Sequence, residues 1–202
     1  MLELVFLIVV IGILAAMIIP RMDRDNRFEA VNQVLSHIKY TQHLAMIEDM
    51  YQDWDPDTGA GSGWFKSRWE IQFFNCGGYA VHSDRGKNGG NAAQLDSAFD
   101  PQTGGRLWIS STCGAPAATD FEKMNLTRYY DLSGFTFSAG CNGQSISFDN
   151  LGRPYGTNTI NGVIQANCDI QLDFNTGNSE AIRIHPETGY ACILTAPGGN
   201  CL

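Results

Sequence analysis

The sequence predicts an α+β fold in which a long N-terminal helix packs against a β-rich head. Two patterns support this prediction. Residues 1–20 are almost entirely apolar, and residues 21–50 then carry apolar side chains at helical spacing. Beyond residue 52, short segments of alternating apolar and polar residues are separated by turns rich in glycine and asparagine, which is typical of β-strands. We therefore divide the chain into an N-terminal helix, residues 1–52, and a β-rich head, residues 53–202.

The composition limits the classes of protein to consider. The 202 residues suit one globular domain with an appendage rather than two full domains. An apolar fraction of 44% is normal for a folded protein, so disorder is not expected. Thirteen Lys and Arg against 21 Asp and Glu give a net charge of −8. This balance argues against a general nucleic-acid-binding protein, because such proteins need a basic surface.

The apolar stretch at residues 1–20 reads MLELVFLIVVIGILAAMIIP, and Glu3 is its single charged residue. As a helix of about 20 residues it would span roughly the 30 Å hydrocarbon core of a bilayer. A cleavable signal peptide would carry basic residues before its apolar core, whereas the first basic residue here is Arg21. A carboxylate in hydrocarbon costs at least ~2.5–3.5 kcal/mol unless it is paired or neutralised. Glu3 is therefore a candidate functional residue, the alternative being that it lies at the membrane interface.

Residues 21–50 predict an amphipathic helix that continues the apolar stretch, giving a rod about 75 Å long. Its second half is expected to bury an apolar stripe against a sheet. The stripe comprises Phe28, Val31, Val34, Leu35, Ile38, Leu44 and Ala45. His37 and His43 also lie on this helix, but their separation of six does not suit a shared metal on one helical face. We expect them to have polar or packing roles.

Alternation in the head predicts a strand at residues 69–73, half-buried because Trp69, Ile71 and Phe73 alternate with polar residues. A return strand is expected at residues 79–82. Further strands are expected around residues 107–110, 135–137, 146–148, 170–174, 181–185 and 190–194. Residues 84–106 are polar and glycine-rich and too long for a simple connection, so we expect an exposed loop there.

Glu3, Gly12 and Pro20 lie nine and eight residues apart in an unbroken field of Val, Ile, Leu and other apolar residues. This pattern closely resembles the mature N-terminus of type IV pilins and type II secretion pseudopilins. Mature pilins usually carry two further residues ahead of the position of Met1, the first of them N-methylated, and are made with a leader peptide. The resemblance covers the first tenth of the chain and is much weaker beyond it.

The pilin resemblance implies an assembly role for these three residues. Glu3 would pair with the N-terminal amine of a neighbouring subunit as that subunit leaves the membrane and enters the filament. Each charge is costly in an apolar bundle until the other arrives. Gly12 and Pro20 bracket a segment that is often melted in filaments of the family. The alternative is a slightly kinked membrane helix, because glycine is a poor helix former and proline removes an amide donor.

The C-terminal half resembles H-type pseudopilins and FimT-like minor pilins less sharply. Four segments carry this resemblance: Ile146-Ser147-Phe148-Asp149, Gly152-Arg153-Pro154, Ile182-Arg183-Ile184 and Thr188-Gly189-Tyr190. It implies a long helix packed on an antiparallel sheet, as the α+β prediction requires.

All six cysteines follow residue 75: Cys76, Cys113, Cys141, Cys168, Cys192 and Cys201. None forms a CxxC pair, so zinc and thioredoxin-like chemistry fit poorly. An even number in the part expected outside the membrane predicts disulfides in an oxidising compartment. Fifteen pairings are possible, and our preferred set joins neighbours along the chain: Cys76–Cys113, Cys141–Cys168 and Cys192–Cys201. The last pair is also implied by the resemblance, because a C-terminal pair closing a short loop recurs in pilins.

Asp53, Asp55 and Asp57 have the spacing of a calcium loop. However, Thr58 occupies the position where such a loop needs glycine, and no glutamate follows at the twelfth position. We therefore favour a solvated acidic loop and expect no bound metal or cofactor. The sequence also contains no nucleophile elbow, Walker sequence or evident acid pair, so we expect no enzymatic activity.

We expect a structural pilin that polymerises through its N-terminal helix into a type IV pilus, a helical filament of many identical copies. Its other partners would be the bacterial inner membrane before assembly and the pilus or secretion machinery, and the filament would be extracellular. The alternative is a minor pilin or H-type pseudopilin, which would form a periplasmic pseudopilus or prime assembly. A DNA-uptake pilin is less favoured because Arg153 and Arg183 are the only Lys or Arg after residue 128.

Overall fold

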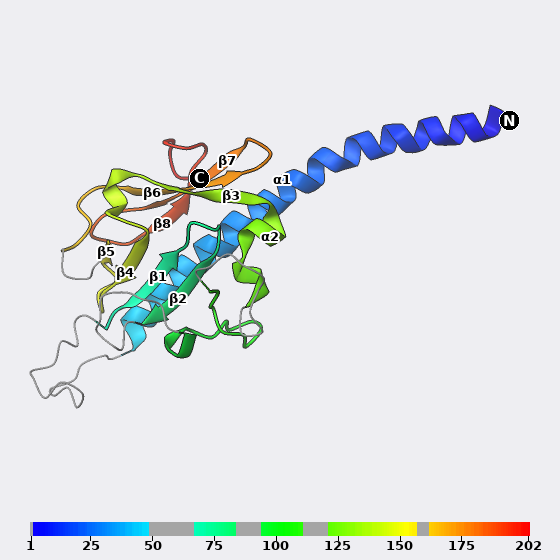
Figure 1. Cartoon of the computed structure of the whole chain (residues 1–202). Coiled ribbons are helices and arrows are strands. Elements are labelled where there is room, and N and C mark those ends of the chain that lie inside the picture. Colours follow the sequence, from blue (N-terminus) through cyan, green and yellow to red (C-terminus); the bar gives the residue numbers. More distant parts are fainter. Residues whose placement is uncertain (1, 49–66, 84–93, 111–120, 157–161) are drawn as a thin grey trace, which may run out of the picture.

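A computed structural model describes residues 2–48, 67–83, 94–110, 121–156 and 162–202, and within the N-terminal helix it describes the side chains of residues 3–14 and 26–48. These residues form one long helix, α1, and a head made of two sheets (Figure 1). The first part of α1 projects away from the head and the second part lies along it (Figure 1). The predicted boundary near residue 52 and the acidic loop with Asp53, Asp55 and Asp57 lie outside the described residues.

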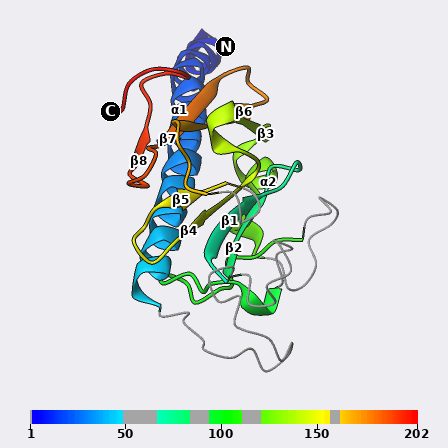
Figure 2. The ribbon, with the colours of Figure 1, turned by 90° about the vertical axis from the view of Figure 1, so that its left-hand side faces the viewer.

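Helix α1 spans Leu2–Ile47, and its second half packs on the head. Figure 2 shows α1 running beside the strands of the head. The buried stripe consists of Ala30, Val31, Val34, Ile38, Thr41 and Ala45. This confirms the amphipathic pattern, although the helix ends before the predicted residue 50. The prediction for Phe28 is wrong, because its side chain is 41% exposed. At 100° per residue, Phe28 lies about 110° from the centre of the stripe, on the flank of the helix.

All strand pairs in the described part of the chain are antiparallel. One sheet has the order β2-β1-β4-β5 and the other β3-β6-β7-β8. The strands are β1 (Trp69–Phe73), β2 (Tyr79–Ser83), β3 (Leu132–Phe137), β4 (Ser145–Phe148), β5 (Pro154–Tyr155), β6 (Cys168–Phe174), β7 (Ser179–Ile184) and β8 (Ala191–Ile193). Short helices complete the head: α2 (Leu126–Tyr130), η2 (Gln94–Asp96), η3 (Glu122–Met124) and η4 (Ala139–Cys141). The α+β prediction with antiparallel sheets is thus confirmed.

Two sequence predictions for the head are wrong in detail. Residues 107–110 form no strand, although the Leu107 amide donates a 2.7 Å hydrogen bond to Ala98 and the Val81 amide a 2.9 Å bond to Leu107. These isolated backbone hydrogen bonds hold residues 107–110 beside β2, but they do not form the regular hydrogen-bond ladder of a β-strand. Strand β1 is not half-exposed, because Glu70 on its supposed outer face is only 2% exposed. Its cross-strand neighbour His82 is buried too, so this face of the sheet is also covered.

The core joins α1 to both sheets. Phe73 of β1 lies at its centre, with its ring centroid 4.9 Å from that of Phe135 in β3 and 5.8 Å from that of Tyr79 in β2. The backbone contacts of α1 reach β1 and β4 in the first sheet and β7 and β8 in the second. Because one continuous apolar cluster includes residues of α1 and of both sheets, the second half of α1 is an integral part of the head.

Candidate assembly helix and its anchorage

The N-terminal part of α1, residues 3–14, is called the apolar arm. Its large apolar side chains are between 37% and 70% exposed: Leu4, Val5, Phe6, Leu7, Ile8, Val9, Val10, Ile11, Ile13 and Leu14. Figure 1 shows this part of the helix standing clear of the head. A contiguous apolar surface of this kind marks a site of contact with protein or lipid, because leaving it in water is unfavourable.

Glu3 is the single charged residue of the apolar arm and lies in the first turn of α1. Its side chain is exposed. The partial positive charge at a helix N-terminus favours a carboxylate there. The arm therefore presents one negative charge at the end of an otherwise apolar rod.

The helix runs without interruption through Gly12 and Pro20 in the single chain. A Cβ added at Gly12 would meet no atom within 4 Å, so no contact within the chain requires glycine there. The melted conformation that the pilin resemblance implies for filaments is therefore not the conformation of the isolated chain, and it stays a prediction about the assembled state.

Within the residues whose side chains are described, no helix has the length and hydropathy expected of a segment that crosses a membrane.

The second half of α1 is fastened to two turns of the head through Gln42. Its Nε2 donates hydrogen bonds to the carbonyl oxygens of Gly152, at 2.9 Å, and Thr188, at 3.1 Å. The turns touch each other as well, because a Cβ built on Gly189 would lie 2.3 Å from the Gly152 oxygen. The turns around Gly152 and Gly189 thus meet at one point on α1.

Asp149 holds the first of these turns in shape. Its Oδ1 accepts hydrogen bonds from the amides of Leu151, at 3.0 Å, and Arg153, at 2.9 Å. Its Oδ2 accepts from Arg153 Nε at 2.7 Å and from the Tyr155 hydroxyl at 3.2 Å. Burial acts to raise the pKa of Asp149, but the hydrogen bonds from Arg153 and Leu151 outweigh it and lower that pKa below its ordinary value. The carboxylate is therefore ionised at neutral pH and orders the turn that receives Gln42.

A partly buried polar network involves Gln33 and His37, which precede Gln42 on α1. Gln33 Nε2 donates a 2.9 Å hydrogen bond to the hydroxyl of Tyr79, which lies 2.7 Å from His37 Nδ1. Because the Tyr79 oxygen accepts from Gln33, its own proton is free to be donated to Nδ1, and we infer that His37 carries its proton on Nε2. Burial lowers the pKa of His37 to about 4, against a smaller opposing effect of Asp100. His37 is therefore neutral at pH 7, with the polar packing role expected of it.

Two of the three preferred disulfides are confirmed, Cys141–Cys168 and Cys192–Cys201. Cys76 is also disulfide-bonded, and Cys113 lies outside the described residues. Oxidised cysteines in these positions are compatible with an oxidising compartment.

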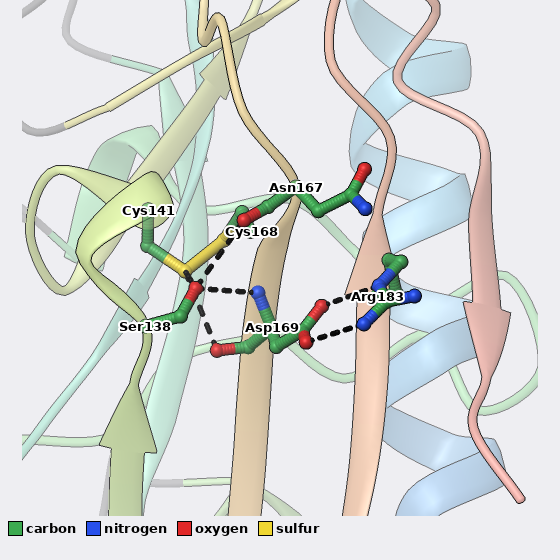
Figure 3. Close-up of a disulfide and its surroundings, with 6 residues drawn as sticks. All are labelled: Ser138, Cys141, Asn167, Cys168, Asp169 and Arg183. Atoms are coloured by element: carbon green, nitrogen blue, oxygen red, sulfur yellow. Dashed lines mark hydrogen bonds and ion pairs between the residues drawn. A yellow bond between two sulfur atoms is a disulfide. The ribbon is translucent and has the colours of Figure 1, made fainter. Parts of the chain in front are cut away.

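An ion pair between Asp169 and Arg183 lies next to the Cys141–Cys168 disulfide (Figure 3). Arg183 of β7 pairs with Asp169 of β6 through Nε and Nη2, each 2.7 Å from a carboxylate oxygen. Its Nη1 donates a 3.1 Å bond to the carbonyl of Gly199, in the loop closed by Cys192–Cys201. Because Asp169 follows Cys168 directly, this arginine connects the two disulfide-bonded regions.

One grouping in the described part of the chain has the composition of a metal site, namely His185, Cys192 and Cys201, with ligand atoms within 4.8 Å of one another. Both sulfurs belong to a disulfide, which does not supply the thiolates that a metal needs. The calcium candidate Asp53, Asp55 and Asp57 lies outside the described residues.

Sequence reasoning missed Gln33, Gln42 and Tyr79 as parts of the anchorage. A signal was present for the first, because Gln33, His37 and Thr41 lie four residues apart and form a polar row that runs from the edge of the buried stripe into it at Thr41. A polar row next to a core face predicts partners in the packed domain. Tyr79 and the partners of Gln42 lie far away in the chain, so local spacing could not identify them.

Comparisons with protein-family models, with curated proteins and with solved structures find no match to this chain.

Proposed function

We propose that this chain is a structural pilin that polymerises through α1 into a type IV pilus filament. The observation that carries the proposal is the apolar arm, a helix with exposed apolar side chains and the single carboxylate Glu3, attached to a folded head. Such a helix needs an apolar environment, and a bilayer before assembly and a bundle of arms after it would each provide one.

The apolar half of the helix, residues 1–20, would lie in the inner membrane before assembly and in the filament core afterwards. In the core, the Glu3 carboxylate would be costly without a counter-charge. Pairing with the N-terminal amine of a neighbouring subunit would neutralise both charges. This mechanism makes Glu3 a determinant of assembly, with no role in the folding of the head.

The head supports the same proposal. The disulfides Cys141–Cys168 and Cys192–Cys201 and the anchorage of α1 through Gln42 make it a crosslinked unit suited to an exposed filament surface. Its later cations are paired, Arg153 with Asp149 and Arg183 with Asp169, each at 2.7 Å. Paired arginines offer little to a phosphate backbone, and we therefore assign no nucleic-acid partner and rank a DNA-uptake pilin below the filament subunit.

A second candidate is a minor pilin or an H-type pseudopilin with the same architecture. The observation that favours it is the meeting of the two turns around Gly152 and Gly189 on α1, because these turns carry the resemblance to H-type pseudopilins. This candidate differs from the first in abundance and in location, which would be a periplasmic pseudopilus or the priming complex of a pilus. Both candidates are structural and neither is an enzyme.

The assembly mechanism is tested by Glu3→Ala in cells that produce the chain together with its assembly machinery. The variant should stay in the membrane fraction at the normal level while the yield of sheared filaments falls at least tenfold. Glu187→Gln, which removes an exposed carboxylate from the head, is the matched control and should leave the yield unchanged. An unaltered filament yield for Glu3→Ala would reject the pairing mechanism.

A further inference from the structure

A pocket of about 490 Å³ lies beside α1, between the helix and the turn at residues 100–103. We call it the α1 pocket. Its lining includes Gln33, Ser36, His37, Asp100, Phe121 and Tyr130. Small-molecule sites are concave and typically about 300–1,000 Å³ in volume. The α1 pocket therefore has the dimensions of a ligand site and is separate from the apolar arm.

The hydrogen-bond network behind the pocket leaves one donor for a ligand. The Tyr130 hydroxyl shares its one proton between Gln33 Oε1, at 3.1 Å, and Glu29 Oε1, at 3.2 Å. Gln33 in turn donates to Tyr79, and the Tyr79 hydroxyl lies 2.7 Å from His37 Nδ1. Within this hydrogen-bond network, His37 Nε2 is the atom for which the described residues provide no partner. The inferred tautomer places a proton on Nε2, so His37, which lines the pocket, carries an uncharged N–H group without a partner.

The turn at residues 100–103, which also lines the pocket, is ordered by hydrogen bonds within the protein. Asp100 Oδ1 accepts a 3.0 Å hydrogen bond from the Gln102 amide, and its Oδ2 accepts from the Thr103 hydroxyl. The backbone amide of Asp100 also bonds the Gly105 carbonyl at 2.7 Å. Phe121 rests on Gly105 so closely that a Cβ there would lie 2.8 Å from the ring. The turn and the aromatic ring are therefore held in fixed positions relative to each other.

The charges around the pocket argue against an ionic ligand. Glu29 and Asp100 would repel an anion, while Lys123 would repel a cation. Both carboxylate oxygens of Asp100 are already engaged within its own turn, and Glu29 Oε1 lies 3.2 Å from the Tyr130 hydroxyl, whose single proton it shares with Gln33 Oε1. Neither carboxylate is thus fully available to bind an ammonium group. A neutral ligand fits this mixture of charges best.

The polar groups of the pocket suit hydroxyl groups. Ser36 and the amides of Asn32 and Gln102 supply both donors and acceptors, and the His37 N–H adds a donor. Sugar hydroxyls both donate and accept, and the C–H face of a pyranose is apolar enough to lie against an aromatic ring such as Phe121. We propose that the α1 pocket binds one neutral sugar ring. This binding does not depend on filament formation.

The proposal is tested on the full chain in lauryldimethylamine oxide micelles, a detergent with neither a sugar nor a choline headgroup. Saturation-transfer NMR is recorded with free glucose, galactose and N-acetylglucosamine, and with lactose, in which a ring ends a longer glycan. Choline and acetate serve as the cationic and anionic probes. At least one neutral sugar should receive saturation, and the ionic probes should receive none. Equal saturation transfer to a free ring and to the same ring in lactose would show that a free sugar is sufficient for binding. Transfer to lactose alone would show that the pocket binds the end of a glycan. Both results support the proposal.

Two variants localise the binding. Ser36→Trp fills the α1 pocket and should reduce the sugar signal at least tenfold, whereas Lys39→Trp, at an exposed position of the same helix outside the lining, should not change it. Asn32→Trp fills the same pocket from another exposed position and replaces Ser36→Trp if that variant does not fold. The proposal is overturned if no sugar receives saturation, if only choline or acetate does, or if the sugar signal persists in the folded pocket-filling variant.

Discussion

Gln42 on α1 donates a 2.9 Å hydrogen bond from its side-chain amide to the backbone carbonyl of Gly152, 110 positions later in the chain. The same nitrogen reaches Thr188 at 3.1 Å, so one side chain joins the helix to two separate turns. The apolar arm is a continuation of this helix. The direction in which the arm leaves the head is thus determined by how the second half of α1 is held.

Gln42→Ala should destabilise the head by about 1–3 kcal/mol, because the partly buried carbonyl oxygen of Gly152 and the exposed one of Thr188 lose their donor. Urea denaturation of the full chain in micelles, followed by tryptophan fluorescence, measures the free energy of unfolding. Lys39→Ala removes an exposed side chain from the same helix and should change that free energy by no more than about 0.5 kcal/mol. Equal stabilities for the two variants would show that the Gln42 bonds do not hold the helix.

Gly189→Ala should be more destabilising than Gly177→Ala. Both glycines have positive φ, +67° and +80°, so alanine at either position costs about 1–2 kcal/mol of backbone energy. At Gly189 the added Cβ would also lie 2.3 Å from the Gly152 oxygen, whereas at Gly177 it would meet nothing within 4 Å. We expect about 3 kcal/mol or more for Gly189→Ala, measured by the same denaturation. A difference of zero between the variants would contradict the close approach of the two turns.

The stability of the head should fall as the pH is lowered from about 6.5 to 4. Burial lowers the folded-state pKa of His37 to about 4 from the ordinary 6.5, so the unfolded chain binds more protons in this window. The loss amounts to at most about 3 kcal/mol and is absent above pH 6.5. His37→Gln should flatten this part of the profile, while His43→Gln, on an exposed part of the same helix, should not. Identical profiles for both variants would exclude His37 as the cause.

Removing the Cys141–Cys168 disulfide should destabilise the head more than removing Cys192–Cys201. The bridged residues are 27 and 9 positions apart, and chain-entropy arguments give about 3.5 and 2.5 kcal/mol for loops of these sizes. Paired Cys→Ala variants compared by urea denaturation provide the measurement. A larger effect for Cys192–Cys201 would mean that its link to Arg183 through Gly199 contributes more than loop closure.

Much of the fold could be predicted because local patterns determine it. Apolar residues at every second position identified β1 and β6, and the helical stripe through Val34 and Ile38 identified the packed half of α1. Residues 107–110 show the limit of such patterns. Leu107 and Ile109 alternate and are both buried, yet they form no strand. Alternation indicates which side chains face the core, but it does not determine whether the backbone finds a partner strand.

Some residues of the candidate site could likewise be predicted from local sequence and others could not. Glu3 and the apolar arm are evident from composition alone, because a lone carboxylate in an apolar stretch has few structural explanations. The anchorage by Gln42 and the network at His37 could not be predicted, since their partners lie on turns and strands far along the chain. The buried Glu70 was missed for the same reason, because only the packed head shows that both faces of its sheet are covered.

We propose that this chain is the subunit of which a surface filament is built. The most direct measurement is electron microscopy of filaments sheared from the producing cells, with mass spectrometry of the dominant protein band. We expect peptides of residues 121–202, which carry the Cys141–Cys168 and Cys192–Cys201 disulfides, to dominate that band. Filaments whose dominant band lacks this chain would contradict it.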